Sequence, residues 1–319
     1  MDYSGLKVKD VIKLKDLTPM LADDSYSSSL IFGRENKVVF FIESSGTGVL
    51  STRQLCTIES LQENNPEVKI VVLYVDPVKV VNLAGQSSLF KVLRNANGRV
   101  VLATVNATYI VEKSGIFKTT AQKIFHVTPY KTHHVSDILR LILIWKFGGF
   151  YMDTDLVIFK NLDKLLSVEN FLLSQVDDSI APYFFGFRKN HPMLQKMMET
   201  ARDEYLPHYY ATVPNAMGSA ISRHFKVTVK EAIHRGKVDD VLVVNSTVFS
   251  PISLDEFVDL FRDNNQQMIQ KIMGSSLGIH VWNYKSGETR IMINSSSPYS
   301  VLARDHCPRA YFGHESDFF

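Results

Sequence analysis

Short, continuously apolar runs alternate with segments of helical periodicity in the first third of the chain. Residues 38–42 and 70–75 consist of Val, Ile, Leu, Phe and Tyr alone, a composition typical of strands buried on both faces. Residues 51–63 between them carry apolar side chains at helical spacing. A second helix at 87–93 and a third strand at 99–103 complete an order that predicts a Rossmann-like, mainly parallel sheet with helices on both faces.

The most apolar helix is expected at residues 136–147, where apolar side chains cover almost the whole circumference. Such a helix is typically buried. Ser136 is its expected N-cap, and the Gly-Gly pair that follows is its expected end. Asp137 and Arg140 lie three residues apart and are therefore neighbours on one face. They form either a simple ion pair or a pair that reaches into a site, and the sequence leaves both open.

Later elements follow a less regular order. No linker is rich enough in Gly or Pro to divide the chain, so we expect one continuous domain over residues 30–319. Residues 1–29 are polar and Ser-rich in stretches and are expected to form a weakly ordered lead-in. The further expected elements are strands at 150–152, 183–187, 241–244 and 277–282 and a helix at 192–205.

The strongest candidate for chemistry is the pair Asp153 and Asp155. It stands between two apolar runs and after Gly-Gly, so it is expected on buried scaffolding, where carboxylates without a cation or hydrogen bonds are costly. Two carboxylates at a strand end suit Mg²⁺ or Mn²⁺, which also accept phosphate oxygens. A metal held there can stabilise a diphosphate leaving group.

A second chemistry fits the same triplet. Asp153-Thr154-Asp155-Leu156-Val157 matches the Asp-X-Asp-X-Val signature of haloacid-dehalogenase phosphatases, in which the first Asp attacks phosphorus. That family usually carries the signature near the start of its fold, whereas more than a hundred residues of α/β pattern precede it here. A nucleotide-dependent transferase therefore fits better.

Charge and hydropathy bear on two classes of partner, nucleic acid and membranes. The net charge is only +2, and no run of Lys and Arg forms a stripe, so nucleic acid is not expected. No apolar stretch reaches the roughly 18 to 20 residues needed to cross a bilayer, and the first residues show no signal-peptide core. Either the chain is soluble as written, or it is the lumenal part of a protein whose anchor is missing from it.

Two cysteines, Cys56 and Cys307, stand near opposite ends of the chain. Their separation fits no metal-site pattern, so they are two buried thiols or one disulfide. Sequons begin at Asn106, Asn245 and Asn294. Together the sequons favour a compartment of the secretory pathway and hence the disulfide.

Several segments together resemble the α1,4-glycosyltransferases related to globotriaosylceramide synthase. The similarity extends over roughly residues 38–310, nearly the whole chain apart from the lead-in. The segments that carry it are 41–46, 53–56, 136–140, 145–155, 280–286 and Cys307-Pro308.

The resemblance implies a GT-A fold, a UDP-sugar donor, Mn²⁺ (or Mg²⁺) and transfer with retention of anomeric configuration. Galactose or N-acetylgalactosamine would pass in α1,4 linkage to a glycosphingolipid or other glycan. Members are Golgi type II membrane proteins that face the lumen. The resemblance thus implies membrane association through the acceptor or through the missing anchor.

The resemblance also implies residue roles. The metal would be held by Asp153 and Asp155, with His280 as a third ligand, and Asp137 and Arg140 would hold donor sugar and phosphate. From their residue types alone, His280 and Trp282 fit an ordinary core equally well, and Glu43 and Ser44 fit a polar turn. The residues implied to bind the nucleotide are Phe41, Ile42, Glu43, Ser44, Tyr151 and Trp282.

Two segments depart from the family pattern. Residues 181–187 lack the Asn-Gly expected at the start of their strand, and Gly218 is followed by Ser where relatives carry Gly-Pro. Both segments are expected on the acceptor side. A catalytically weak or inactive UDP-binding, lectin-like homologue is therefore the second hypothesis, and the phosphatase is the third.

Overall fold

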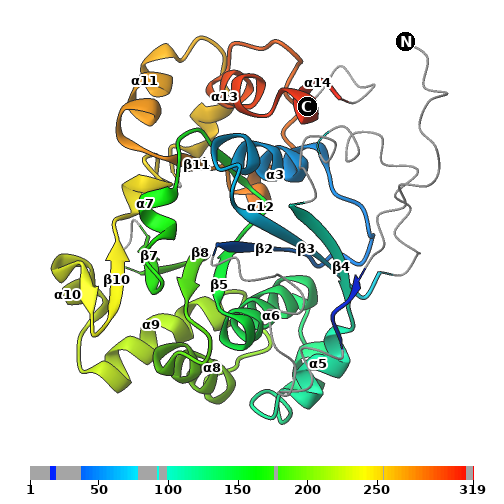
Figure 1. Cartoon of the computed structure of the whole chain (residues 1–319), viewed down its shortest axis with the longest axis vertical. Helices are drawn as coiled ribbons and strands as arrows, with labels where there is room; N and C mark the ends of the chain where they lie inside the picture. Colours follow the sequence, from blue (N-terminus) through cyan, green and yellow to red (C-terminus); the bar gives the residue numbers. More distant parts are fainter. Residues whose placement is uncertain are drawn as a thin grey trace.

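The structure is a computed structural model that describes residues 15–18, 37–77, 92, 99–175, 179–253, 255–313 and 319. Of the predicted lead-in the structure describes only residues 15–18, which form strand β1 and place Leu17 in the core, so this part is not the weakly ordered segment expected. Of the helix predicted at 87–93 it describes only Val92. A central sheet with helices on both faces dominates the described chain (Figure 1).

The central sheet joins strands from both halves of the chain. Its first five strands are parallel to one another, which confirms the mainly parallel sheet predicted from the apolar runs at 38–42, 70–75 and 99–103. β8 breaks the rule, because it runs antiparallel to both of its neighbours, β5 and β7. In order across the sheet the strands are β1 (Lys15–Asp16), β4 (Val100–Val105), β3 (Lys69–Val75), β2 (Val38–Glu43), β5 (Gly149–Met152), β8 (Ile180–Phe187), β7 (Phe171–Ser174), β10 (Val241–Val244) and β9 (Lys237–Val238).

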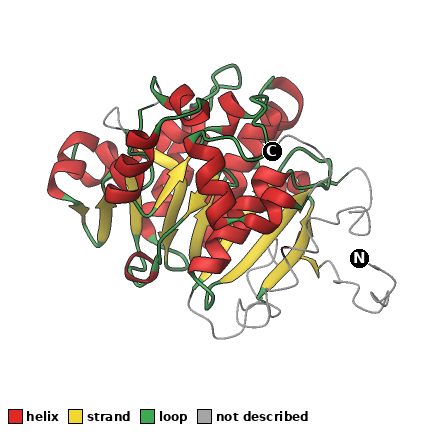
Figure 2. Cartoon of the chain, turned by 90° about the horizontal axis from the view of Figure 1, so that it is seen from above, coloured by secondary structure: helices red, strands yellow, loops and turns green. Residues whose placement is uncertain are grey.

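Two hydrophobic cores lie on opposite faces of this sheet, since successive side chains of a strand point to opposite sides. Seen from above, the strands run side by side beneath the helices of one face (Figure 2). That face carries α3 (Thr52–Asn64), α11 (Gln266–Ser275), α13 (Pro298–His306) and α14 (Pro308–Phe312). The other face carries α5 (Ala107–Lys113), α6 (Lys131–Phe147), α8 (Pro192–Asp203), α9 (Thr212–Phe225) and α10 (Val229–Arg235).

A small second sheet brings the C-terminal part of the chain to the middle of the molecule. β6 (Leu156–Ile158) pairs antiparallel with β11 (Gly278–His280), and His280 lies opposite Leu156. The short helix α12 (Asn283–Ser286) follows β11. The remaining short elements are α7 (Asp163–Leu166), the π-helix η2 (Lys123–Val127) and the 3-10 helices η3 (Ser246–Val248) and η4 (Phe257–Phe261).

Helix α6 is buried as expected, but its predicted start was wrong. It begins at Lys131, five residues before Ser136, and the residue at its N-cap, Tyr130, makes no capping hydrogen bond through its side chain. The polar first turn is held by tertiary contacts instead, because buried His134 bonds the Tyr205 hydroxyl at 2.7 Å. An N-cap rule considers only residues near the helix start, so it cannot predict a contact between residues this far apart in the sequence.

Other boundaries moved by a few residues. The helix predicted at 192–205 ends at Asp203, and the strand predicted at 277–282 is shortened to β11. Helix α9 was not predicted, because Pro214 and Gly218 within it lower the helix propensity of the segment.

The predicted disulfide is confirmed. Cys56 in α3 is bonded to Cys307, which directly precedes α14. The disulfide thus joins two positions that lie 251 residues apart in the sequence. Glu59, fully buried one turn along α3, accepts hydrogen bonds from the backbone amides of Arg309 and Ala310 at 2.9 and 2.7 Å. Disulfide and carboxylate together fix the C-terminal helices on α3. Within the described ranges, no helix combines the length and the apolar character needed to cross a bilayer.

Candidate active site

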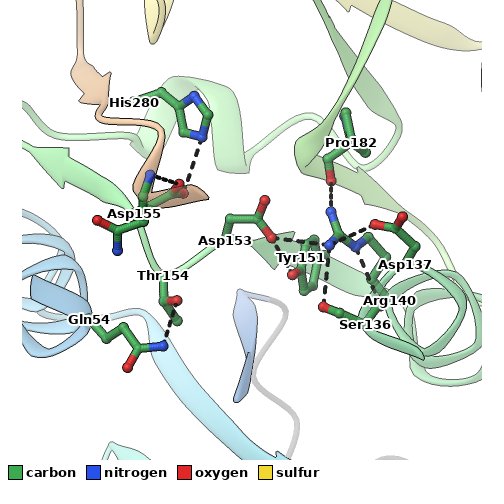
Figure 3. Close-up of polar contacts among 11 residues, drawn as sticks. Gln54, Ser136, Asp137, Arg140, Tyr151, Asp153, Thr154, Asp155, Pro182 and His280 are labelled. Atoms are coloured by element: carbon green, nitrogen blue, oxygen red, sulfur yellow. Dashed lines mark hydrogen bonds and ion pairs between the residues drawn. The ribbon is translucent and has the colours of Figure 1, made fainter. Parts of the chain in front are cut away.

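The acidic triplet links the two sheets. Asp153 follows β5, and its amide donates to the carbonyl of Tyr183 in β8 at 2.7 Å. The carbonyl of Asp155, just before β6, accepts from the amide of Val281 at 2.9 Å. Both carboxylates therefore lie where the main sheet, the small sheet and the segment after β11 meet (Figure 3).

His280 completes a three-ligand cluster with the pair. Its Nε2 lies 3.2 Å from Asp155 Oδ1, and its ring stacks on Tyr183 with centroids 4.3 Å apart. The amide of Asn283 donates to Asp155 Oδ2 at 3.0 Å. Candidate ligand atoms of Asp153, Asp155 and His280 all lie within 4.8 Å of one another.

Arg140 of α6 faces the cluster from the other side of Asp153 (Figure 3). Its Nη2 lies 2.9 Å from Asp137 Oδ1 and 3.4 Å from Asp153 Oδ1, and its Nη1 donates to the carbonyl of Pro182 at 2.9 Å. The guanidinium also lies over the Tyr151 ring, 4.5 Å from its centroid. The structure shows the ion pair of Asp137 and Arg140 and places Arg140 beside Asp153, while sugar and phosphate binding by the two residues stays a prediction.

The local charges shift the acidic groups in different directions. Burial raises the pKa of Asp153, and the Asp155 charge adds to this rise while Arg140 opposes it. Burial alone would also raise the pKa of Asp155, but His280 and the Asn283 amide lower it below its usual value. Burial raises the pKa of Asp137 to about 6 although Arg140 opposes the rise. Asp155 is thus the carboxylate most firmly held as an anion.

The three candidate ligands, Asp153, Asp155 and His280, fit a divalent cation. Two carboxylates and one imidazole are ligands that Mn²⁺ accepts, and Mg²⁺ prefers the carboxylates. The nitrogen of His280 that faces the pair is Nε2, 3.2 Å from Asp155 Oδ1, so the imidazole presents a ligand atom on the same side as the carboxylates. The side chains of Asp153 and Asp155 are 27% and 14% exposed, which leaves the cluster open on one side.

The residues implied to bind the nucleotide lie in different surroundings. Phe41 is fully buried in the core facing α3, and Ile42 is buried in the core on the opposite face, so neither side chain borders an open pocket. Glu43 and Ser44 stand at the carboxyl end of β2. Glu43 is buried, and its Oε1 accepts from the Ser45 amide at 2.8 Å while Oε2 has no partner among the described residues.

Tyr151 and Trp282 take part in the site through other contacts. The buried Tyr151 hydroxyl donates to Asp153 Oδ1, so Tyr151 holds the Asp153 carboxylate in place. Trp282 adopts a left-handed backbone conformation with φ of 47° and packs edge-on against His280 at 5.0 Å. Trp282 thus turns the chain sharply between His280 and Asn283, both of which contact Asp155.

Sequence reasoning did not find three supporting contacts. Tyr183 supports the His280 ring, and Gln54 donates to the Thr154 hydroxyl at 3.3 Å. The third is the backbone amide of Asn283. A backbone amide is present in every residue except proline, so the sequence does not single it out. Tyr183 and Gln54 lie on β8 and α3, which are far in sequence from the residues that they contact.

Comparisons with known proteins assign most of the chain to glycosyltransferase regions. Residues 51–172 match the family model of the glycosyltransferase sugar-binding region containing a DXD motif. Residues 186–312 match the model of the α1,4-glycosyltransferase conserved region.

Individual relatives agree with these matches. The chain is 24% identical to human lactosylceramide 4-alpha-galactosyltransferase over 283 residues, which cover 86% of this chain and 76% of that protein. It is 31% identical to human alpha-1,4-N-acetylglucosaminyltransferase over 186 residues, 56% of this chain and 51% of that protein. A galactosyltransferase solved with donor and acceptor sugar analogues is 13% identical, covers 88% of this chain and 96% of its own, and has a TM-score of 0.41.

The matched regions and the acidic triplet at the meeting point of two sheets define a glycosyltransferase with an α/β fold of the GT-A type. Two family models, each matching part of the chain, thus confirm the resemblance to DXD-containing α1,4-glycosyltransferases that the segments around Asp153 and His280 indicated. Because Asp153 and Asp155 fall inside the sugar-binding region, the triplet is not a phosphatase signature.

Proposed function

We propose that this protein transfers galactose or N-acetylgalactosamine from a UDP-sugar to a glycan acceptor in α1,4 linkage, with retention of configuration. The observation that carries the proposal is the cluster of Asp153, Asp155 and His280, with Arg140 3.4 Å from Asp153. Cation ligands and a guanidinium side by side suit a substrate that carries a diphosphate.

Asp153, Asp155 and His280 would hold the metal, Mn²⁺ by preference because imidazole is one of the ligands. When bound, the cation acts as a Lewis acid that stabilises the negative charge of the departing UDP. Arg140 supplies a second, permanent positive charge. Asp137 orients Arg140 and can accept a hydroxyl of the donor sugar.

The transfer breaks the bond between the anomeric carbon and the β-phosphate oxygen and forms a bond from that carbon to the acceptor oxygen. The acceptor proton passes to the departing diphosphate, so UDP and the elongated glycan are the products. Reaction on the same face of the sugar requires no protein nucleophile, and we assign none.

The relatives point to two donors. One is named for galactosyl transfer to lactosylceramide and another for transfer of N-acetylglucosamine. The similarity to the second enzyme makes UDP-N-acetylglucosamine a specific further candidate. A donor screen should therefore include UDP-galactose, UDP-N-acetylgalactosamine and UDP-N-acetylglucosamine with Mn²⁺ and a panel of glycosphingolipids.

The same relatives and the resemblance support proposals for the acceptor class and the compartment. We propose a glycolipid or other glycan acceptor and a Golgi-lumenal location, as for a type II membrane protein. The confirmed disulfide and the exposed sequon residues Asn106, Asn245 and Asn294 support a secretory compartment.

The first test replaces Asp153 or Asp155 by Asn and measures Mn²⁺-dependent hydrolysis and transfer. We expect each variant to lose well over tenfold in turnover, more than ~1.4 kcal/mol of transition-state stabilisation. The matched control is Asp203→Asn, because Asp203 is exposed at the end of α8. Turnover within tenfold of the parent in both site variants would refute the metal assignment.

The second hypothesis, a UDP-binding homologue without catalysis, makes a different prediction. It expects UDP to bind with Mn²⁺ while no donor is hydrolysed and no glycan is extended. Calorimetric titration of UDP beside the donor screen separates the two hypotheses.

A further inference from the structure

A stack of aromatic rings stands beside the acidic cluster and takes no part in the chemistry above. The rings of Tyr210 and Tyr284 lie 4.8 Å apart at 27°. His133 meets both edge-on, at 4.9 and 5.4 Å. The three residues come from α6, from the segment before α9 and from α12, so only the tertiary fold assembles the stack.

Two contacts tie the stack to the reaction centre. On one side, His133, Asp137 and Arg140 follow one another at helical spacings of four and three on α6 and share a face, and Arg140 contacts Asp153. On the other side, Tyr284 directly follows Asn283, whose amide bonds Asp155 at 3.0 Å. The stack therefore joins α6 to α12, the two helices whose residues contact Asp153 and Asp155.

Electrostatics agree with this position. Burial raises the pKa of the Tyr210 hydroxyl, and the charges of Asp137 and Asp153 raise it further. Burial and the Arg140 charge lower the pKa of His133, so its ring is neutral at pH 7. A neutral imidazole beside two phenols suits an uncharged ligand better than a phosphate.

Tyr284 offers an open ring face. It is 64% exposed although Tyr210 holds it from one side. One face of a hexopyranose consists mainly of C–H groups, which carry a slight positive charge and are attracted to the negative face of an aromatic ring. The His133 ring, which meets Tyr284 edge-on, offers a nitrogen acceptor to a hydroxyl at the edge of such a sugar.

We propose that the Tyr210–Tyr284 stack binds the terminal hexopyranose of the acceptor glycan and presents its hydroxyl to the donor. This inference rests on the proposed function. It locates the acceptor by aromatic stacking at α12, whereas the sequence placed the acceptor side at residues 181–187 and near Gly218. Uncharged glycans with a terminal galactose are the probes to use, because relatives act on lactosylceramide.

The test compares Tyr284→Ala and Tyr284→Trp with the parent, using Mn²⁺, the active UDP-sugar and methyl β-lactoside. For Tyr284→Ala we expect the acceptor KM to rise about tenfold or more, with less than a threefold change in acceptor-independent donor hydrolysis. Tyr284→Trp keeps an aromatic face and should stay within about threefold of the parent. Tyr109→Ala is the control, because Tyr109 is also an exposed tyrosine, 44% against 64%, and lies on α5, which contributes no ring to the stack.

Saturation-transfer NMR with methyl β-lactoside, methyl β-galactoside and N-acetyllactosamine adds a measurement that needs no turnover. The parent should show saturation of at least one glycan, and Tyr284→Ala should lose it. A parent that binds none of the three overturns the stack proposal. An equal fall of hydrolysis and transfer in Tyr284→Ala also overturns it, since the stack would then close over the donor. Absence of donor hydrolysis with intact glycan binding would refute the proposed function alone.

Discussion

At the scale of single residues, Arg140 organises the candidate site. One guanidinium contacts the carboxylates of Asp137 and Asp153, the carbonyl of Pro182 and the ring of Tyr151. Such a set of contacts needs the planar, forked geometry of arginine, which a lysine ammonium cannot reproduce. The residue thereby joins α6, β5 and β8 around one charge.

Arg140→Lys is therefore expected to reduce donor hydrolysis about 100-fold, ~2.7 kcal/mol in activation free energy, because the positive charge remains but its orientation is lost. Kinetics of UDP-sugar hydrolysis at saturating Mn²⁺ provide the measurement. Arg188→Lys is the control, since the Arg188 side chain is half exposed and pairs at the surface with Asp240. A variant Arg140→Lys with parental kcat and KM would show that the fork geometry is dispensable.

At the scale of elements, the join between α6 and β5 sets the position of the acidic pair. Gly148 and Gly149 both have positive φ, 71° and 93°. A Cβ on Gly149 would lie 2.8 Å from the carbonyl oxygen of Val38 in the neighbouring strand. Glycine is required here both for backbone conformation and for space, because α6 must turn directly into a central strand.

Gly149→Ala is expected to destabilise the fold by roughly 1–3 kcal/mol, because strain and a backbone clash coincide. Urea denaturation followed by circular dichroism measures the loss. Gly274→Ala in α11 is the matched control: a Cβ there meets nothing within 4 Å, so stability should stay equal or rise slightly. Equal stability of Gly149→Ala and the parent would contradict the close approach to Val38.

At the scale of the whole molecule, the C-terminal segment is held on the first helix by covalent and polar links. The Cys56–Cys307 disulfide and the Glu59 carboxylate fix α14 on α3. Buried Arg53 also donates to the carbonyl of Ser286 at 2.8 Å, at the end of α12. These links position the chain that carries His280, so distant parts of the sequence stabilise the metal-binding cluster together.

The double variant Cys56→Ala/Cys307→Ala is expected to lose roughly 2–5 kcal/mol of unfolding free energy, because it releases the constraint on the unfolded chain. The parent should show the same loss when unfolded in dithiothreitol, and the double variant should be insensitive to the reductant. A parent whose urea midpoint does not move in dithiothreitol would contradict a stabilising disulfide.

Elements with local signals were predictable from the amino-acid sequence. The continuously apolar runs of β2 and β3 predicted buried parallel strands, and the acidic pair after Gly-Gly predicted a carboxylate site near a central strand. Family resemblance added His280 and Trp282, whose residue types alone fitted an ordinary core equally well. Hydrophobic periodicity and short motifs carry this information because each depends on neighbours within a few residues.

Features that depend on residues far apart in the sequence became visible in the folded chain. The start of α6 is set by the bond of His134 to Tyr205, not by a capping residue, and the antiparallel direction of β8 has no signature in its own sequence. The stack of Tyr210 on Tyr284 joins residues 74 positions apart. Contacts of this kind arise when the chain packs, so their physical cause lies in long-range burial and hydrogen bonding and not in local propensity.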